Sequence, residues 1–438
     1  MPVAELDGCS RLAPTLRLAA RRAGTPAYVV DELALAAAAD ELAAAFPDPW
    51  LRHHSLKAND TPAVVALLGA RGVDANVVSA GEWTLARRGG IPNDRTTLEG
   101  IGKSDGDLRA AVRAAAAGEP LRWVALESPD EAGRLAALAR RAGTTLDVLL
   151  RFNPDVAPET LAGLAVGSGA SKFGMTEAEI SAAIEAGGGP GGPLRWRGLH
   201  LHVGSQLGAV DAWREAVRRS LALVALWRGS IPAFDTLDVG GGFPVAAPGE
   251  PGPSPARFAR ELPALIEAIP ADRRPRRLAV EPGRFLVARA GWLVGRVLHA
   301  RERGGPLVVV DAGMAELIRP ALYGAHHGIV ALTSLGRAVD PARPDGPGGA
   351  AVPGGAASGR RPVPTRVAGP ICESTDELGV HPLPPLRRGD LVAIRDAGAY
   401  GSSMSSRYNG RPRPPELIAA VDGGLRVARR RGSLASLV

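Results

Sequence analysis

The chain has 438 residues, a formal charge of +7 and a sequence pI near 10.0, and it is long enough for a large core and for two domains. Only 4% of its residues are aromatic, and its arginines are spread along the chain, so we expect neither the stacking platform nor the basic stripe of a nucleic-acid-binding protein. No apolar run reaches the ~18 residues of a membrane span, and Cys9 and Cys372 are too few for a disulfide framework, so we expect a globular, cytoplasmic protein with no membrane contact.

The first predicted element is a strand-like run at 26–30, which follows a Gly-Thr turn and leads into an alanine-rich helix. A single short strand cannot form a sheet, so it needs partners from elsewhere in the chain. We expect this N-terminal segment, residues 1–30, to join a domain that is completed much later.

From Trp50 onward, short apolar runs alternate with helical segments rich in Ala, Leu and Arg. The eight runs are 51–57, 76–79, 96–99, 123–127, 146–152, 198–203, 237–239 and 278–281. Parallel strands need helical crossovers and are buried on both faces, so this pattern predicts an α/β fold, a (β/α)8 TIM-type barrel over residues 31–288. An open doubly wound sheet is the alternative.

After about residue 290 the pattern changes to Val- and Leu-rich strands separated by Gly-Pro turns. The predicted strands are 293–298, 307–310, 328–332, 365–368 and 391–395. This pattern predicts a C-terminal, mostly-β domain, residues 289–438, that also takes in the N-terminal strand. Residues from about 334 to 364 are very rich in Gly, Pro and Ala and predict a mobile surface insertion.

Residues that can act in catalysis or ligand binding follow the predicted barrel strands, whose C-terminal ends meet on one face. There the chain places Lys57, Glu127, Arg151, His202, Gly240–Gly242 and Glu281. A lysine at the end of a buried strand can be an ordinary strand-end residue. It can also be half of an ion pair, or an amine held for Schiff-base chemistry. The other residues on this face suit a phosphate-bearing cofactor and favour the last interpretation.

Two segments offer groups for a phosphate. His202 is followed by Gly204 and Ser205, so backbone N–H groups and a hydroxyl are available, although an isolated histidine is often a satisfied core residue. The glycines 240–242 let backbone amides approach an anion without interference from a Cβ atom. Pro244 follows them, so this turn is not a dinucleotide fingerprint.

Residues 281–284 read Glu-Pro-Gly-Arg and place an acid at a strand end and a base after a forced turn. The plain interpretation is a surface ion pair, which contributes little to stability. The functional interpretation sends Glu281 to a ring nitrogen and Arg284 to a phosphate or a substrate carboxylate.

In the predicted β-domain, residues 369–376 put the thiol of Cys372 beside carboxylates in a loop. A lone cysteine is more often a small buried hydrophobe. Residues 397–401 and 408–414 add phenols and guanidinium groups to the same domain.

Together these motifs resemble the fold-type III pyridoxal-phosphate decarboxylases, and within that family the diaminopimelate decarboxylases. The resemblance covers about residues 28–416, and seven motifs follow one another in the family's order. They are Lys-Ala-Asn (57–59), Ser-Lys-Phe-Gly (171–174), His-x-His-x-Gly-Ser-Gln (200–206), Gly-Gly-Gly-Phe (240–243), Glu-Pro-Gly-Arg (281–284), Cys-Glu-Ser-x-Asp (372–376) and Gly-Ala-Tyr (398–400).

The resemblance implies that Lys57 and Cys372 are catalytic. Lys57 would carry pyridoxal 5'-phosphate covalently, and Cys372 would return a proton to the substrate's α-carbon. Glu281 would keep the ring nitrogen of this electron-withdrawing cofactor protonated. The remaining residues implied for the cofactor are His202, Ser205, Gly240, Gly241, Gly242, Gly283, Arg284 and Tyr400. Those implied for the substrate are Arg284, Arg319, Tyr323, Glu373 and Tyr400; no metal site is expected.

The family's matching cysteine and glutamate reach the site of the partner subunit, so the resemblance implies a head-to-tail homodimer with shared active sites. The charged and phenolic residues implied for substrate binding imply an amino-acid substrate with a charged distal group. The expected reaction is therefore the decarboxylation of meso-diaminopimelate to L-lysine, a step of lysine biosynthesis. The alternatives are a related decarboxylase for another amino acid, including a carrier-bound one, in specialised metabolism, and a non-catalytic pyridoxal-phosphate-binding homologue.

The sequence departs from the family's pattern in four places, one of which is the glycine- and proline-rich insertion at about 334–364. Asn76 stands where the family usually has an aspartate near the cofactor lysine, so an expected charge partner of the lysine is missing. Residues 98–104 have a glycine where the family prefers asparagine, and residues 157–169 differ from the family's usual loop.

Overall fold

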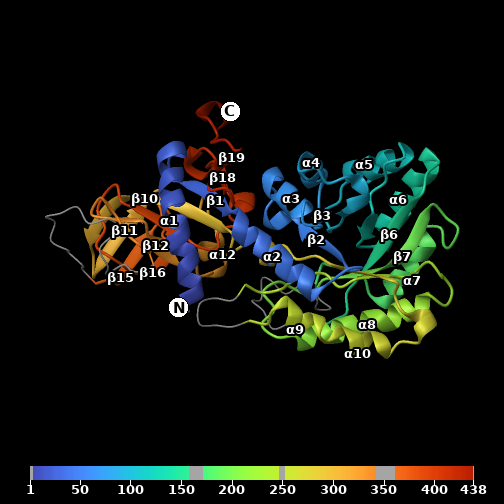
Figure 1. The fold of residues 1–438 in the computed structure, drawn as a ribbon. Helices are drawn as coiled ribbons and strands as arrows, with labels where there is room; N and C mark the ends of the chain where they lie inside the picture. The colour runs from blue at the N-terminus through green and yellow to red at the C-terminus, as the bar shows by residue number, and fades with distance from the viewer. Residues whose placement is uncertain (1–2, 157–170, 246–251, 342–360, 438) are drawn as a thin grey trace. The chain divides into compact units, whose positions relative to one another are not determined.

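The computed structural model describes residues 3–156, 171–245, 252–341 and 361–437. They form two compact units (Figure 1). One unit holds the described residues of 36–286. The other is built from the two ends of the chain, up to residue 35 and from residue 287 on.

The first unit is a closed barrel of eight parallel strands that follow one another in chain order. The strands are β2 (Leu51–Ser55), β3 (Asp74–Val77), β4 (Thr96–Leu98), β5 (Trp123–Leu126), β6 (Leu146–Phe152), β7 (Leu194–Leu201), β8 (Thr236–Asp238) and β9 (Arg277–Val280). The predicted TIM-type barrel is confirmed, and the open doubly wound sheet is not formed.

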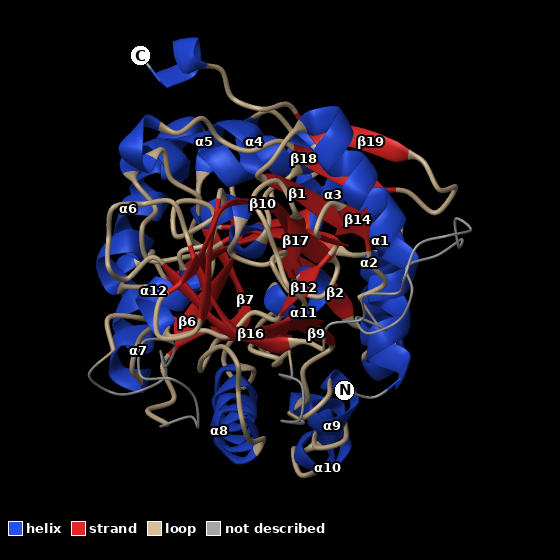
Figure 2. Ribbon diagram, turned by 90° about the vertical axis from the view of Figure 1, so that its left-hand side faces the viewer, coloured by secondary structure: helices blue, strands red, loops and turns tan. Residues whose placement is uncertain are grey.

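Helices cover the outside of this barrel (Figure 2). They are α3 (Pro62–Gly69), α4 (Ala80–Arg88), α5 (Asp105–Ala116), α6 (Pro129–Ala142), α7 (Glu177–Ala186), α8 (Asp211–Trp227), α9 (Pro255–Ala259) and α10 (Leu262–Glu267), while α2 (Glu32–Ala45) precedes β2. Serine or threonine side chains cap α4, α5, α6 and α7, which fixes where each helix begins. Within the described ranges, no helix is both long and apolar enough to cross a membrane.

Two strand boundaries differ from the sequence prediction in an informative way. β2 ends at Ser55, so Lys57 lies in a following turn and not at the end of the strand. β7 starts at Leu194 instead of 198, because its first residues alternate between buried apolar side chains and arginines that pair with Asp147.

The second unit contains a nine-stranded sheet. Its strands are β1 (Ala27–Asp31), β10 (Gly291–Glu302), β11 (Pro306–Val310), β12 (Ile329–Ala331), β15 (Val363–Ala368), β16 (Glu377–Leu383), β17 (Leu391–Ile394), β18 (Glu416–Ala419) and β19 (Leu425–Arg429). β1 lies between β10, which is antiparallel to it, and β18, which is parallel. The mostly-β fold that takes in the N-terminal strand is thus confirmed.

Helices and turns complete this unit. The long helix α1 (Val3–Ala23), which the sequence did not predict, packs Leu12 and Leu16 in one hydrophobic cluster with Trp292 and Leu417. The short helix α12 (Arg319–Tyr323) follows β11, whereas α11 (Arg284–Val287), which precedes β10, begins in the barrel unit. Apolar burial of this kind contributes roughly 1.5–3 kcal/mol for each large side chain.

The predicted glycine-rich insertion lies mainly outside the described residues, because 342–360 are not among them. Its described ends are regular: β13 (Thr333–Ser334) and β14 (Arg337–Ala338) form a hairpin, and β15 begins at Val363. The predicted departure at residues 157–169 also lies outside the described residues.

Candidate active site

Lys57 is presented by a 3-10 turn, η1 (Leu56–Ala58), that follows β2. Its two neighbours in the turn are buried, while the lysine itself is exposed. The turn is held by His54, whose Nε2 lies 2.9 Å from the carbonyl oxygen of Asn59 and donates to it. The sequence therefore anchors the backbone on both sides of the amine and leaves the amine accessible.

His202 lies near the amine of Lys57. The partial burial of its ring, and then the positive charge of Lys57, lower the pKa of His202 well below its ordinary value. Arg151, at the end of β6, adds to this effect. The N–H of Gly241 points at Nδ1 of His202 at 3.4 Å, so this nitrogen is an acceptor and the imidazole is neutral.

The three glycines after β8 pass so close to neighbouring backbone that no side chain would fit. A Cβ atom on Gly240 would lie 2.2 Å from the carbonyl oxygen of Leu201, and Gly241 and Gly242 have equally short distances of 2.4 Å. Gly240 and Gly242 also have positive φ angles, +69° and +97°. Only glycine can form this turn. Two of its N–H groups bond within the protein, that of Gly240 to Oδ1 of Asp238 and that of Gly241 to Nδ1 of His202.

Arg284 and Ser205 lie together beside this turn. Arg284 begins α11 and is 6% exposed, and its Nη2 donates to the hydroxyl of Ser205 at 3.2 Å. The loops after β7 and β8 are joined by Gln206, whose side chain bonds to both the N–H and the carbonyl of Val245. A buried guanidinium, a hydroxyl and a glycine turn make a suitable cradle for a phosphate.

Glu281 is buried at the end of β9 and bonded from two sides. The amide of Asn76 donates to its Oε1, and His200 Nε2 lies 3.1 Å from its Oε2. Asn76 was interpreted from the sequence as a missing charge partner of the lysine. In the structure it is a hydrogen-bond donor to the acid that the sequence assigns to the ring nitrogen.

The sequence prediction missed three residues of this cluster: Glu99, His200 and Asp238. They are 4%, 2% and 0% exposed, and each ends or follows a barrel strand. His200 could have been found, because residues 200 and 202 of one strand point to the same side. Glu99 had only its position at a strand end to mark it.

Glu127 and Arg151, at the ends of β5 and β6, form a buried ion pair. Burial alone would raise the pKa of Glu127, but the charge and hydrogen bond of Arg151 and the N–H of Gly174 together lower it. The pair is connected to the Lys57 region, since the charge of Arg151 acts on His202.

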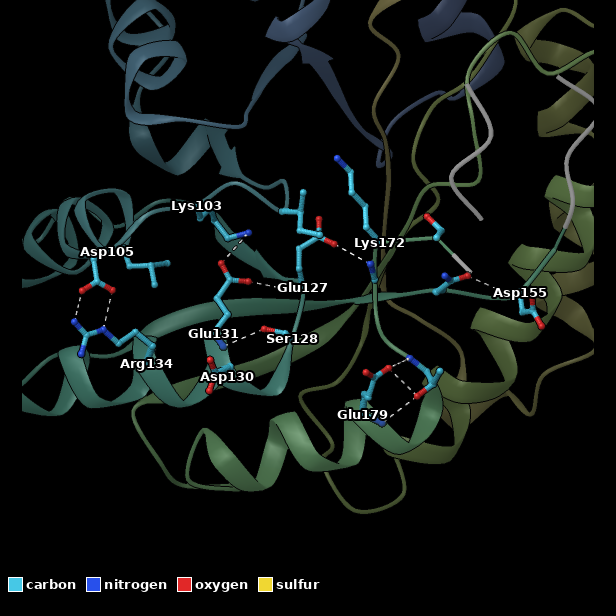
Figure 3. A pocket seen from close by; sticks show the side chains of 16 residues that line it. Lys103, Asp105, Glu127, Ser128, Asp130, Glu131, Arg134, Asp155, Lys172 and Glu179 are labelled. Carbon is cyan, nitrogen blue, oxygen red and sulfur yellow. Dashed lines mark hydrogen bonds and ion pairs between the residues drawn. The ribbon is translucent and has the colours of Figure 1, made fainter. Parts of the chain in front are cut away.

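Glu127 also lines a cavity of about 780 Å³ (Figure 3). Two ion pairs lie among its lining residues, Lys103 with Glu131 at 3.1 Å and Arg134 with Asp105. None of the residues predicted to bind cofactor or substrate lines it. The predicted residues of the barrel lie instead at the strand ends around Lys57.

The remaining predicted residues belong to the second unit. Cys372 and Glu373 are exposed in the loop after β15, where Asn409 Nδ2 lies 3.5 Å from the thiol and the hydroxyl of Tyr408 donates to Glu373. Tyr400 has a φ of 58°, a backbone conformation that is uncommon for residues other than glycine.

Arg319 and Tyr323 begin and end α12. Arg319 is 9% exposed, and its Nη1 donates to Nε2 of His327 at 3.1 Å. The other ring nitrogen of His327 donates to the carbonyl of Arg395 at 3.0 Å. A guanidinium has no acceptor, so these contacts define a neutral His327 with its proton on Nδ1.

Comparison with known proteins gives the same family. Residues 34–288 match the model of the pyridoxal-dependent decarboxylase, pyridoxal binding domain. The chain is 37% identical to a diaminopimelate decarboxylase of Actinosynnema pretiosum over 95% of this chain and 89% of that protein, and 32% identical to one of Aquifex aeolicus over 95% and 91%. Its fold is similar to the crystal structure of diaminopimelate decarboxylase from Helicobacter pylori complexed with L-lysine, with a TM-score of 0.82, 29% identity and coverage of 95% and 96% of the two chains.

Proposed function

This chain belongs to the pyridoxal-dependent decarboxylases and uses pyridoxal 5'-phosphate, and we propose that it converts meso-diaminopimelate to L-lysine and CO2. The observation that carries the proposal is the grouping of an exposed Lys57, a neutral His202, a phosphate cradle and the buried Glu281 on one end of the barrel. The relatives that match nearly the whole chain are diaminopimelate decarboxylases, which supports this substrate.

The residues of the barrel fit the cofactor. The turn at Gly240, Gly241 and Gly242 excludes side chains where a phosphate would bind, and Arg284 with Ser205 would supply a positive charge and a hydroxyl. Gly283 would allow the backbone to pack closely against the turn that carries Lys57, because a Cβ atom there would lie 3.0 Å from Cβ of Ala58. Lys57 would hold the cofactor covalently.

The chemistry then depends on where charge is held. When bound, pyridoxal phosphate withdraws electrons from the substrate's α-carbon as CO2 leaves. Glu281 would keep a proton on the ring nitrogen, while neutral His202 would pack against the ring without adding a competing charge. Cys372 would donate the proton that replaces the carboxyl group.

Substrate binding is assigned to the second unit. Arg319 would bind a carboxylate of the distal amino-acid group, and Tyr323, Glu373, Tyr400 and Arg284 are also proposed to bind the substrate. Cys372 and Glu373 would act in the site of the partner subunit, so the proposal includes a homodimer with shared active sites. It also includes a cytoplasmic location, which agrees with two free cysteines.

The test is CO2 release from a panel of amino acids: meso-diaminopimelate, L-lysine, L-ornithine and L-arginine. We expect turnover with meso-diaminopimelate alone and formation of L-lysine. Turnover with another amino acid but none with meso-diaminopimelate would favour a specialised decarboxylase. No turnover with any of them, from protein that carries the cofactor, would favour a non-catalytic homologue.

His327 should act on substrate affinity through Arg319. Replacing His327 with phenylalanine removes the acceptor that orients the guanidinium, and we expect KM for meso-diaminopimelate to rise about 10- to 100-fold, the value of one hydrogen bond to a charged group. We expect kcat to change little, because no group at the cofactor is altered. Steady-state kinetics give both constants.

His327→Gln is the matched control, since a glutamine amide can accept from Arg319 and donate to the carbonyl of Arg395. It should restore most of the affinity. A fall in kcat at constant KM in His327→Phe would show that Arg319 does not act in substrate binding.

A further inference from the structure

Three acidic side chains meet inside the barrel: Glu99, Asp238 and Glu281. They are 4%, 0% and 6% exposed, and in the part of the chain that the structure describes none of them forms an ion pair with lysine or arginine. Three ionised carboxylates so deep in a protein would be very costly. Protons must therefore be distributed among them in a defined way.

His200 is one hydrogen-bond donor to this cluster. Its Nε2 lies 3.1 Å from Oε2 of Glu281 and 3.4 Å from Oε2 of Glu99. Burial lowers the pKa of His200 to about 4, so the ring is neutral. Its Nδ1 is buried without a hydrogen-bond partner among the described residues. Burying an unpaired lone pair there costs less free energy than burying an unpaired N–H. The proton of the ring therefore lies on Nε2.

Glu281 is the ionised member. It accepts from the amide of Asn76 on one oxygen and from His200 on the other, and donors of this kind favour the carboxylate form. The carboxylate oxygens of Glu99 and Glu281 and the ring nitrogen of His200 all lie within 4.8 Å of one another. A second negative charge at that distance is strongly unfavourable.

Glu99 holds the proton that this arrangement requires. Its Oε1 is buried without a hydrogen-bond partner among the described residues. Burial, and then the negative charge of Glu281, raise the pKa of Glu99 to about 8. Burial and the charge of Glu281 also raise the pKa of Asp238 well above its ordinary value.

We propose that Glu99 is a positioning residue which, as a neutral carboxylic acid beside Asn76 and His200, holds Glu281 as the ionised carboxylate of the cluster. This inference rests on the proposed function, in which Glu281 controls the ring nitrogen. It also explains Asn76: an aspartate there would add a fourth carboxyl group, whereas the amide adds a donor. The positive charges of Lys57 and Arg151 contribute to the low pKa of His200 and so help to keep its ring neutral.

The test compares Glu99→Gln with wild-type protein from which the cofactor has been removed. At pH 7 the infrared spectrum of the wild-type protein should contain a protonated-carboxyl band that is weaker in Glu99→Gln. Glu185→Gln, which changes an exposed side chain of α7, is the matched control and should leave the band unchanged. Equal bands in wild type and Glu99→Gln would overturn the proposal.

Stability gives a second measurement. Folding raises the pKa of Glu99 from 4.5 to about 8, so the wild type loses stability as pH rises through this interval. Glu99→Gln does not titrate. Its unfolding constant should fall relative to that of the wild type by about tenfold per pH unit within the interval, and the difference should level off above it. No pH dependence of the difference would contradict a protonated Glu99.

Activity separates this inference from the proposed function. Glu99→Gln keeps a neutral donor and should retain kcat within about threefold, whereas Glu99→Ala should lose more than tenfold. Equal losses in both variants would show that a carboxylate is required and overturn the inference. Wild-type protein that releases no CO2 would refute the proposed function and leave the infrared result standing. If Glu99→Gln does not fold, the test is a pH titration of the wild type: the protonated-carboxyl infrared band must weaken as pH rises, with a midpoint near pH 8.

Discussion

Replacing Lys57 with alanine is expected to abolish CO2 release, with a loss on the order of 10⁴-fold or more, as for other covalent catalytic groups. The chain offers few other amines that could hold the cofactor in place of Lys57. The sequence contains only three lysines, Lys57, Lys103 and Lys172. Lys103 is fully buried and paired with Glu131, while Lys172 packs its amine 5.2 Å from the ring of Phe173.

The measurement is the visible absorbance of the lysine-bound cofactor, followed by borohydride reduction and mass spectrometry of the peptides. The cofactor's mass should be found on the peptide that contains Lys57. Lys172→Ala is the matched control, because it removes another exposed amine of the barrel unit and should keep the absorbance. Lys57→Ala protein with an unchanged band, or a modified peptide that contains Lys172, would show that Lys57 is not the attachment point.

The barrel could be predicted from the sequence because short apolar runs alternate with helical segments along the chain. The strands of the second unit were harder to find. β16 contains Gly379 and Pro382, residues typical of turns, and its side chains are partly exposed. It is a strand because it pairs with β15 along its length, a long-range interaction that local preference does not record.

In the candidate site, too, some features could be predicted from the sequence and others could not. The glycine turn after β8 could be predicted, because positions that accept no Cβ atom must be glycine in any sequence that forms this turn. The carboxyl cluster could not be predicted, because Asn76, Glu99, His200 and Glu281 come from or follow β3, β4, β7 and β9. Only closure of the barrel brings these four side chains into contact. Asn76 in particular changes from a missing charge to a donor once its partner is known.

Replacing Glu281 with glutamine should give the second large loss, about 10²–10³-fold in kcat with little change in KM, as when one preorganised charged group is removed from a catalytic site. The amide carries no negative charge, so it cannot keep the ring nitrogen protonated. The visible absorbance should persist, because Lys57, Arg284 and the glycine turn are intact. Kinetics with meso-diaminopimelate and absorbance of the same samples provide the test.

Folding stability distinguishes a catalytic loss from a damaged structure. Glu281→Gln removes the negative charge that raises the pKa values of Glu99 and Asp238, so the free energy of unfolding at pH 7 should not fall. Glu99→Gln is the closest control, since it makes the same substitution in the same cluster and should keep its activity. If both variants lost activity equally, the negative charge would not be specific to Glu281. If Glu281→Gln were fully active, the ring nitrogen would not depend on this acid.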